Sequence, residues 1–194
     1  MTGNTQRSFE VIANAHGVRI RPGESLPWLD NRGHLNDHVM QAVPEATIRH
    51  LRQVFLRLGG NERALVRKLR SGNVRPDFVW PERMLLVEVD ESQHFTSERL
   101  SILNSYPEDS DLAYDLEGYR RLAHRWHGTA DRYRASKRTV EFDYPVGRRA
   151  QRAYFDTTRD LLAPSFGYRV LRVAAPERDP KRAFARFETQ LAAL

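Results

Sequence analysis

The segment from residue 76 to residue 94 constrains the fold of this 194-residue chain more than any other. Two runs rich in β-forming residues, 76–80 and 84–90, are separated by Pro81 and two polar residues. Pro81 disfavours a helix at this point, and a short link between two such runs is typical of a β-hairpin. We therefore predict two antiparallel strands, of which the second contains the apolar run Met84–Val87 and is buried.

Three carboxylates flank this hairpin: Asp77, Glu88 and Asp90. Glu88 and Asp90 share a face of their strand, roughly 7 Å apart, and the antiparallel return brings Asp77 near Glu88. Burying such acids costs several kcal/mol unless a partner compensates them, and Mg²⁺ or Mn²⁺ is one such partner. A bound ion would activate a water molecule and stabilise charge on a phosphate. The spacing leaves two interpretations open: a metal site made of the three acids, or a set of strand-end acids bridged by nearby arginines.

The rest of the chain alternates between helical and β patterns. Apolar residues three or four apart, such as Leu51 and Phe55, predict an amphipathic helix at 45–58. Further elements are predicted as a helix at 62–70, a helix at 148–162, a strand at 168–173 and a closing helix from 179. The order helix, strand, strand, helix, strand, helix predicts an α/β sandwich with a central mixed sheet flanked by helices.

Two segments fall outside this pattern. Residues 1–44 are interrupted by glycines and prolines, and we interpret them as an N-terminal extension with a short helix or strand at 9–13 and loop elsewhere. Residues 96–147 form a long polar insertion, acidic at first and basic from Arg120 onward, with a helix expected around 112–123. The predicted organisation is therefore an extension at 1–44 and one α/β domain at 45–194 that carries a largely helical insertion.

The charge of the chain favours a polyanionic partner, because its formal net charge is +6. Only three of its 31 Lys and Arg residues are lysines, and the planar fork of arginine suits phosphate oxygens. A GC-rich coding bias would also enrich arginine, and a charged helix face is often simply solvated. The candidates for nucleic-acid binding are Arg67, Lys68, Arg70, Arg75, Arg120, Arg121, Arg125, Arg148, Arg149, Arg152 and Arg159.

Several classes of protein are disfavoured by what the sequence lacks. Without cysteine there are no disulfides or thiolate zinc sites, in keeping with a reducing cytoplasm. No apolar run reaches the ~18 residues that cross a membrane, and the N-terminus has no secretory pattern. The chain also lacks a Gly-x-Ser-x-Gly elbow, a Walker loop and a His-Glu-x-x-His helix. We expect a cytoplasmic protein that does not engage membranes.

A series of motifs follows the order found in a known superfamily. It begins with Glu62 in a predicted helix and Asp77-Phe78, and continues with Glu88-Val89-Asp90-Glu91-Ser92-Gln93-His94, Asp156-Thr157-Thr158-Arg159 and Gly167-Tyr168-Arg169-Val170-Leu171-Arg172. Over residues 60–95 and 148–194 this order resembles the PD-(D/E)xK, restriction-endonuclease-like nucleases, in particular their branch related to very-short-patch-repair endonucleases. Each motif alone is weak, whereas all of them in sequence are fairly specific.

The resemblance implies a restriction-endonuclease-like fold and a set of metal ligands. Asp77 and Glu88 would be the main ligands of a Mg²⁺ or Mn²⁺ ion, and the Val89 carbonyl would assist them. Glu62 would approach the ion from its helix, although an acid near a helix start is also favoured there by the helix dipole.

Catalytic roles would fall on residues that follow the second strand. Asp90 stands where the wider superfamily usually has a lysine, so Gln93 or His94 would orient the attacking water or protonate the leaving oxygen. Asp156 and Arg159 would contact each other or the phosphate, and the alternative is a plain surface pair at a helical spacing of three. Glu91 departs from the pattern because it replaces the usual glycine, and the insertion at 96–147 replaces a connection of a few residues.

The function implied by the resemblance is that of a Mg²⁺-dependent deoxyribonuclease, which would hydrolyse phosphodiester bonds in DNA during repair or defence against foreign DNA. The alternative is a catalytically inactive module of the same fold that binds nucleic acid or a partner protein. The sequence leaves open whether the substrate is DNA or RNA, and it leaves the oligomeric state open, a dimer included.

Overall fold

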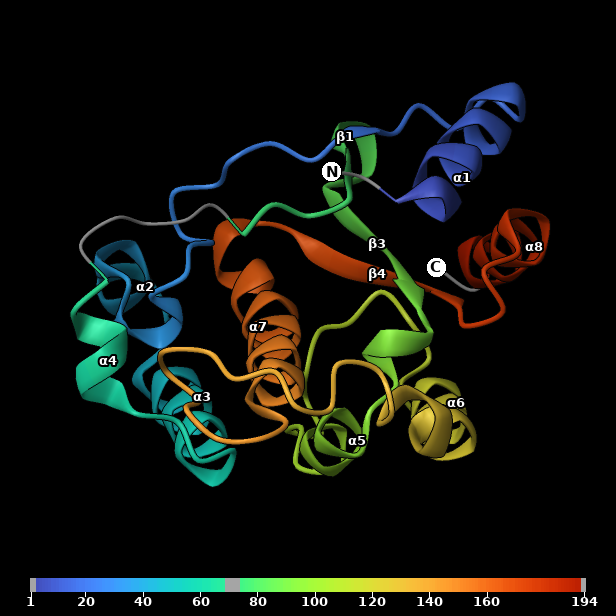
Figure 1. Ribbon diagram of the computed structural model, residues 1–194. Coiled ribbons are helices and arrows are strands. Elements are labelled where there is room, and N and C mark those ends of the chain that lie inside the picture. The colour runs from blue at the N-terminus through green and yellow to red at the C-terminus, as the bar shows by residue number, and fades with distance from the viewer. Residues whose placement is uncertain (1–2, 69–73, 193–194) are drawn as a thin grey trace.

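The computed structural model describes residues 3–68 and 74–192 (Figure 1). In this described part, four strands form one mixed sheet in the order β1 (Arg21–Pro22), β2 (Phe78–Trp80), β3 (Leu85–Glu91) and β4 (Arg169–Ala175). The pairs β1–β2 and β2–β3 are antiparallel, whereas β3 and β4 are parallel. The predicted hairpin and the mixed α/β class are therefore confirmed.

Helices cover both faces of the sheet. They are α1 (Asn4–Ala15), α2 (Asp37–Ala42), α3 (Glu45–Arg57), α4 (Glu62–Val66), α5 (Ser97–Leu103), α6 (Leu116–Ala130), α7 (Gly147–Leu162) and α8 (Pro180–Leu191). On one face α1 and α8 lie side by side, and on the other α7 is packed against α3 and α5 (Figure 1). No helix of the described chain is long and apolar enough to cross a membrane.

The hairpin places the first acids of the predicted site. A single 3-10 turn, η2 (Pro81–Arg83), joins β2 to β3, and Phe78 is paired with Val87. Because antiparallel pairing continues one residue at a time, this register sets Asp77 opposite Glu88. Side chains on β3 alternate, so Glu88 faces α7 while its neighbours Val87 and Val89 face the layer of α1 and α8.

The N-terminal residues contribute to the common core. Phe9 of α1 is fully buried, with ring centroids 6.2 Å from Phe78 and 5.4 Å from Phe187. β1 adds a strand beside β2, and Gly23 N–H donates to the Asp77 carbonyl at 2.9 Å. The short element expected at 9–13 is a helix, although α1 is longer than expected, and the expectation of loop for the rest of 1–44 is wrong for α2. Glycines and prolines fall between these helices rather than within them.

The segment 96–147 packs against the domain, but it is helical only in α5 and α6, with irregular chain between and after them, so the expectation of a largely helical insertion holds only in part. Its helix α6 begins at Leu116, because residues before it run along β4, where Ala113 N–H donates to the Val170 carbonyl at 3.0 Å. Arg99 of α5 is buried and donates to Asp160 of α7 at 2.6 Å. The predicted helix at 62–70 ends earlier, at Val66, and Arg70 lies outside the described residues.

Candidate active site

Asp77 and Glu88 come together as the hairpin register requires. Asp77 N–H donates to Glu88 Oε1 at 3.2 Å, and Val89 N–H donates to Asp77 Oδ2 at 2.9 Å. Within the described chain, the other carboxylate oxygen of Asp77, Oδ1, has no hydrogen bond. The two acids therefore lie together, just before β2 and in the middle of β3, and the Val89 N–H helps to hold Asp77 in place.

Both acids line a cleft of about 500 Å³. Asp156 and His94 also line it, and so do five cationic side chains among the described residues: Lys68, Arg75, Arg148, Arg152 and Arg159. A carboxylate pair at the wall of a cleft rich in arginine is an arrangement that can hold a cation and a phosphate at the same time.

The protonation of the two acids is perturbed by their surroundings. Burial raises the pKa of Glu88 well above its ordinary value, an effect that the nearby Asp77 adds to and Arg159 opposes. Burial also raises the pKa of Asp77, which the hydrogen bond from Val89 opposes. Two adjacent carboxyl groups whose ionised forms are disfavoured will gain from a cation, which is the behaviour expected at a metal or catalytic site.

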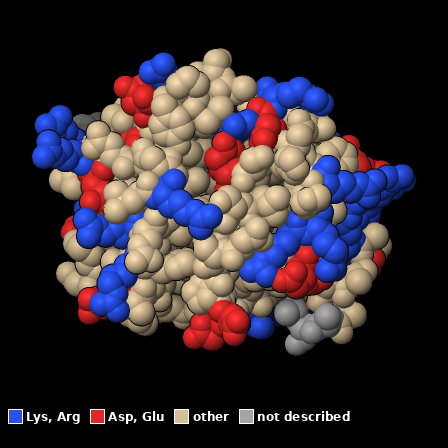
Figure 2. Space-filling model, turned by 90° about the horizontal axis from the view of Figure 1, so that it is seen from below, with Lys and Arg blue, Asp and Glu red and all other residues tan. Residues whose placement is uncertain are grey.

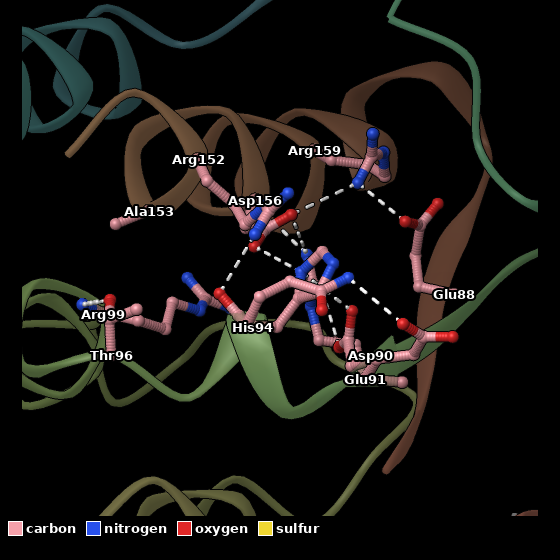
Figure 3. A network of polar contacts seen from close by, with 12 residues as sticks. Glu88, Asp90, Glu91, His94, Thr96, Arg99, Arg152, Ala153, Asp156 and Arg159 are labelled. Atoms are coloured by element: carbon pink, nitrogen blue, oxygen red, sulfur yellow. Dashed lines mark hydrogen bonds and ion pairs between the residues drawn. The ribbon is translucent and has the colours of Figure 1, made fainter. Parts of the chain in front are cut away.

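Glu88 has a cationic partner in the structure. Its Oε2 lies 2.8 Å from Nη1 of Arg159 on α7, and this nitrogen also lies 3.4 Å from Oδ1 of Asp156 (Figure 3). The predicted contact between Asp156 and Arg159 is therefore present, but both residues are buried, so the alternative of a surface pair is wrong. Glu88 is bridged by an arginine, as in the alternative interpretation of the strand-end acids.

Asp90 takes a different position from the one expected. It is completely buried, accepts hydrogen bonds from Tyr119 Oη at 2.7 Å and from Arg172 at 2.8 Å, and is not among the described residues that line the cleft. Burial opposes its ionisation, but Arg172 and His94 hold the pKa of Asp90 below its ordinary value. Asp77, Glu88 and Asp90 therefore do not form one group that could share a metal ion, because Arg172 of the neighbouring strand β4 binds Asp90.

His94 is held in place by acids beneath it. Its Nδ1 lies 2.9 Å from Asp156 Oδ2 and 3.1 Å from Asp90 Oδ1, and its side chain is 17% exposed in the cleft (Figure 3). Burial opposes ionisation of Asp156, but His94 and Arg172 hold the pKa of Asp156 well below its ordinary value. Since Nδ1 is engaged and Nε2 has no partner within the described chain, Nε2 is the atom that can exchange a proton with a ligand.

Two predicted catalytic residues lie elsewhere. Glu62 accepts hydrogen bonds from Arg52 at 2.8 and 3.0 Å and lies 3.2 Å from His34 Nε2. The side chain of Gln93 donates to Glu91 at 3.3 Å. Neither Glu62 nor Gln93 belongs to the described lining of the cleft. Both side chains have partners within the fold that the sequence pattern did not reveal.

The remaining basic candidates do not line the cleft in the described structure. Arg120 donates to the Leu103 carbonyl and Arg149 to Glu98, so both have partners within the fold. Arg67, Arg121 and Arg125 are exposed. Figure 2 views the side of α3, α5 and α6, where Lys and Arg gather toward one edge beside Asp and Glu.

The donor set in the cleft is small for a metal ion. Among the described residues, no group of three or more His, Asp or Glu side chains is arranged to hold a metal. However, Mg²⁺ commonly uses one or two carboxylates and completes its shell with waters and substrate phosphates. Among the described residues Asp77 Oδ1 accepts no hydrogen bond, and Glu88 lies beside it, so the pair would offer ligands to Mg²⁺ or Mn²⁺ only if Glu88 exchanged Arg159 for the ion.

Sequence reasoning missed the polar network beneath the cleft. Arg172 is fully buried and contacts Asp90, Asp156 and Asp160, the last at 2.8 Å from its Nε. The available signal was the placement of Arg172 between Leu171 and Val173, inside an apolar run.

Comparisons of the chain with protein-family models, curated proteins and solved structures find no match. The geometry of the cleft is therefore the basis on which a function is assigned.

Proposed function

We propose that this chain is a metal-dependent endonuclease that hydrolyses phosphodiester bonds in DNA, in repair or in defence against foreign DNA. The observation that carries the proposal is the adjacency of Asp77 and Glu88 in a cleft that also presents His94 and a set of arginines. Burial raises the pKa of both acids, so a cation bound between them would be strongly favoured once they ionise. The surrounding arginines supply the charge that a DNA backbone requires.

Each group in the cleft has a role in this proposal. Asp77 and Glu88, with the main chain at Val89, would hold Mg²⁺ or Mn²⁺, which when bound supplies Lewis-acid stabilisation of phosphate charge and an activated water. His94 would transfer a proton through Nε2, and Asp156 keeps the ring oriented through Nδ1. Arg75, which is exposed at the cleft, would bind a phosphate of the substrate.

Cleavage of supercoiled plasmid tests the proposal directly. With Mn²⁺ or Mg²⁺ the protein should convert supercoiled DNA to the nicked or linear form, and EDTA should stop the conversion. Binding to the same plasmid is measured in parallel by mobility shift. Unchanged supercoiled DNA at every metal concentration, despite clear binding, would contradict the hydrolytic assignment.

A binding module without catalysis is the second candidate. It is favoured by the ion pairs of Glu88 with Arg159 and Asp90 with Arg172, because these guanidinium groups already neutralise acids that a nuclease would use. Both candidates require DNA to occupy the cleft, whereas a module for a partner protein does not.

Salt dependence separates cleft binding from other modes of association. Arg75→Ala should weaken DNA binding and reduce the slope of log K against log salt by about 1, because one phosphate contact is lost. The control is Arg19→Ala, another exposed arginine that does not line the cleft. Equal slopes for the parent protein and both variants, measured by fluorescence anisotropy, would place the DNA elsewhere.

A further inference from the structure

We infer that Arg159 couples metal binding to phosphate binding: it neutralises Glu88 when no metal ion is bound, and it turns to the substrate phosphate when a divalent cation takes its place on Glu88. This inference rests on the proposed function. It assigns to Arg159 a positioning and regulatory task in the same cleft, distinct from the tasks of the metal ligands.

The first support is the competition for Glu88. One oxygen, Oε1, accepts from Asp77 N–H, and the other, Oε2, is bonded to Arg159 Nη1 at 2.8 Å. A cation that uses this carboxylate must therefore compete with the guanidinium. Arg159 thus lowers the affinity of the empty cleft for a metal ion.

The second support is the unused hydrogen-bonding capacity of Arg159. Its side chain is only 6% exposed, yet within the described chain its Nε is buried without a hydrogen-bond partner. A buried N–H left unpaired is costly, so such a group points to a missing acceptor. Because the guanidinium lines the cleft and presents a planar fork of donors, a phosphate is the ligand that fits it.

The third support is that little else holds Arg159 to its present partner. Among the described residues its other contact is with Asp156 at 3.4 Å, and Asp156 is already engaged by His94 at 2.9 Å (Figure 3) and by Arg172 at 3.5 Å. When a divalent ion takes Glu88, Arg159 is left with one long contact beside a cleft that binds phosphate. Metal and phosphate then favour each other, and this effect is reciprocal.

Arg152 offers a matched control. It lines the same cleft and carries the same charge, but its hydrogen bond goes to the Gln93 carbonyl at 3.1 Å and not to Glu88. Arg152→Gln therefore removes one positive charge without freeing the carboxylate, whereas Arg159→Gln does both.

The test is a titration with Mn²⁺ alone at pH 8, with free Mn²⁺ measured by electron paramagnetic resonance. Arg159→Gln should bind Mn²⁺ about tenfold more tightly than the parent protein, and Arg152→Gln should change the affinity much less. Asp77→Asn should abolish saturable binding. Circular dichroism confirms that each variant is folded, and Arg159→Lys, which keeps the charge but lacks the fork, should bind with intermediate affinity if the Gln variant does not fold.

Coupling is measured in the same titration with sulfate, a tetrahedral dianion that stands in for phosphate. Sulfate should raise the Mn²⁺ affinity of the parent protein and leave that of Arg159→Gln unchanged. The inference is overturned if Arg159→Gln and Arg152→Gln change the Mn²⁺ affinity equally, or if sulfate still raises the Mn²⁺ affinity of Arg159→Gln. In either case, saturable Mn²⁺ binding that depends on Asp77 would leave the proposed function standing. Absence of saturable binding in every protein would refute both.

Discussion

Asp77→Asn is expected to lower the rate of metal-dependent plasmid nicking by about a hundredfold to a thousandfold. Asp77 presents Oδ1 without a hydrogen bond in the described chain, beside Glu88, and this oxygen is the anionic donor most available to a metal ion. Asparagine keeps an oxygen that can accept from Val89 N–H, so the hairpin should retain its register. The measurement is the initial rate of nicking across a range of Mn²⁺ concentrations.

The matched control is Asp37→Asn, the same chemical change at an acid that is 65% exposed and paired with Arg32. This variant should nick DNA at the parental rate, because Asp37 does not belong to the described lining of the cleft. A parental rate for Asp77→Asn at saturating Mn²⁺ would show that Asp77 does not hold the metal. A loss of activity in both variants would indicate a general effect of charge.

The part of the site that could be predicted from sequence is the part made by neighbours along the chain. The pairing of Asp77 with Glu88 follows from the short turn and from the alternation of side chains along each strand, which together fix the register of the hairpin. The contact between Asp156 and Arg159 follows from a helical spacing of three. These contacts need only local geometry, and the structure contains them.

The part that could not be predicted depends on contacts between distant segments. Asp90 is bound by Arg172, 82 residues later in the chain, and an arginine in a strand normally indicates a solvated position. Arg172 is buried because the segment 96–147 covers this face, contributing Tyr119, whose hydroxyl donates to Asp90. Likewise, Glu62 contacts His34, and His34 belongs to the segment 1–44, which the sequence led us to interpret as an extension.

The buried network gives the second large expectation, because Arg172→Met should reduce the free energy of unfolding by about 3–5 kcal/mol. Methionine fills much of the volume but removes hydrogen bonds of 2.8 Å to Asp90, 2.8 Å to Asp160 and 3.0 Å to the Asp156 carbonyl. The acids stay buried with fewer partners, which is why breaking a buried ion pair costs more than breaking an exposed one. Urea unfolding at pH 7 measures the change.

Arg169→Met on the same strand is the control, since Arg169 is 41% exposed and its ion pair with Asp111 is long at 3.8 Å. Its cost in unfolding free energy should stay below about 0.5 kcal/mol.

The difference in unfolding free energy between the parent protein and Arg172→Met should also depend on pH. Arg172 helps to hold the pKa of Asp90 and of Asp156 below the ordinary value of 3.8. Its stabilisation is therefore complete above that value and is lost as the pH falls through the lower pKa values of the folded protein. An equal loss of unfolding free energy for Arg172→Met and Arg169→Met, or a difference that does not shrink in acid, would mean that ion pairing to Arg172 does not stabilise the polar network beneath the cleft.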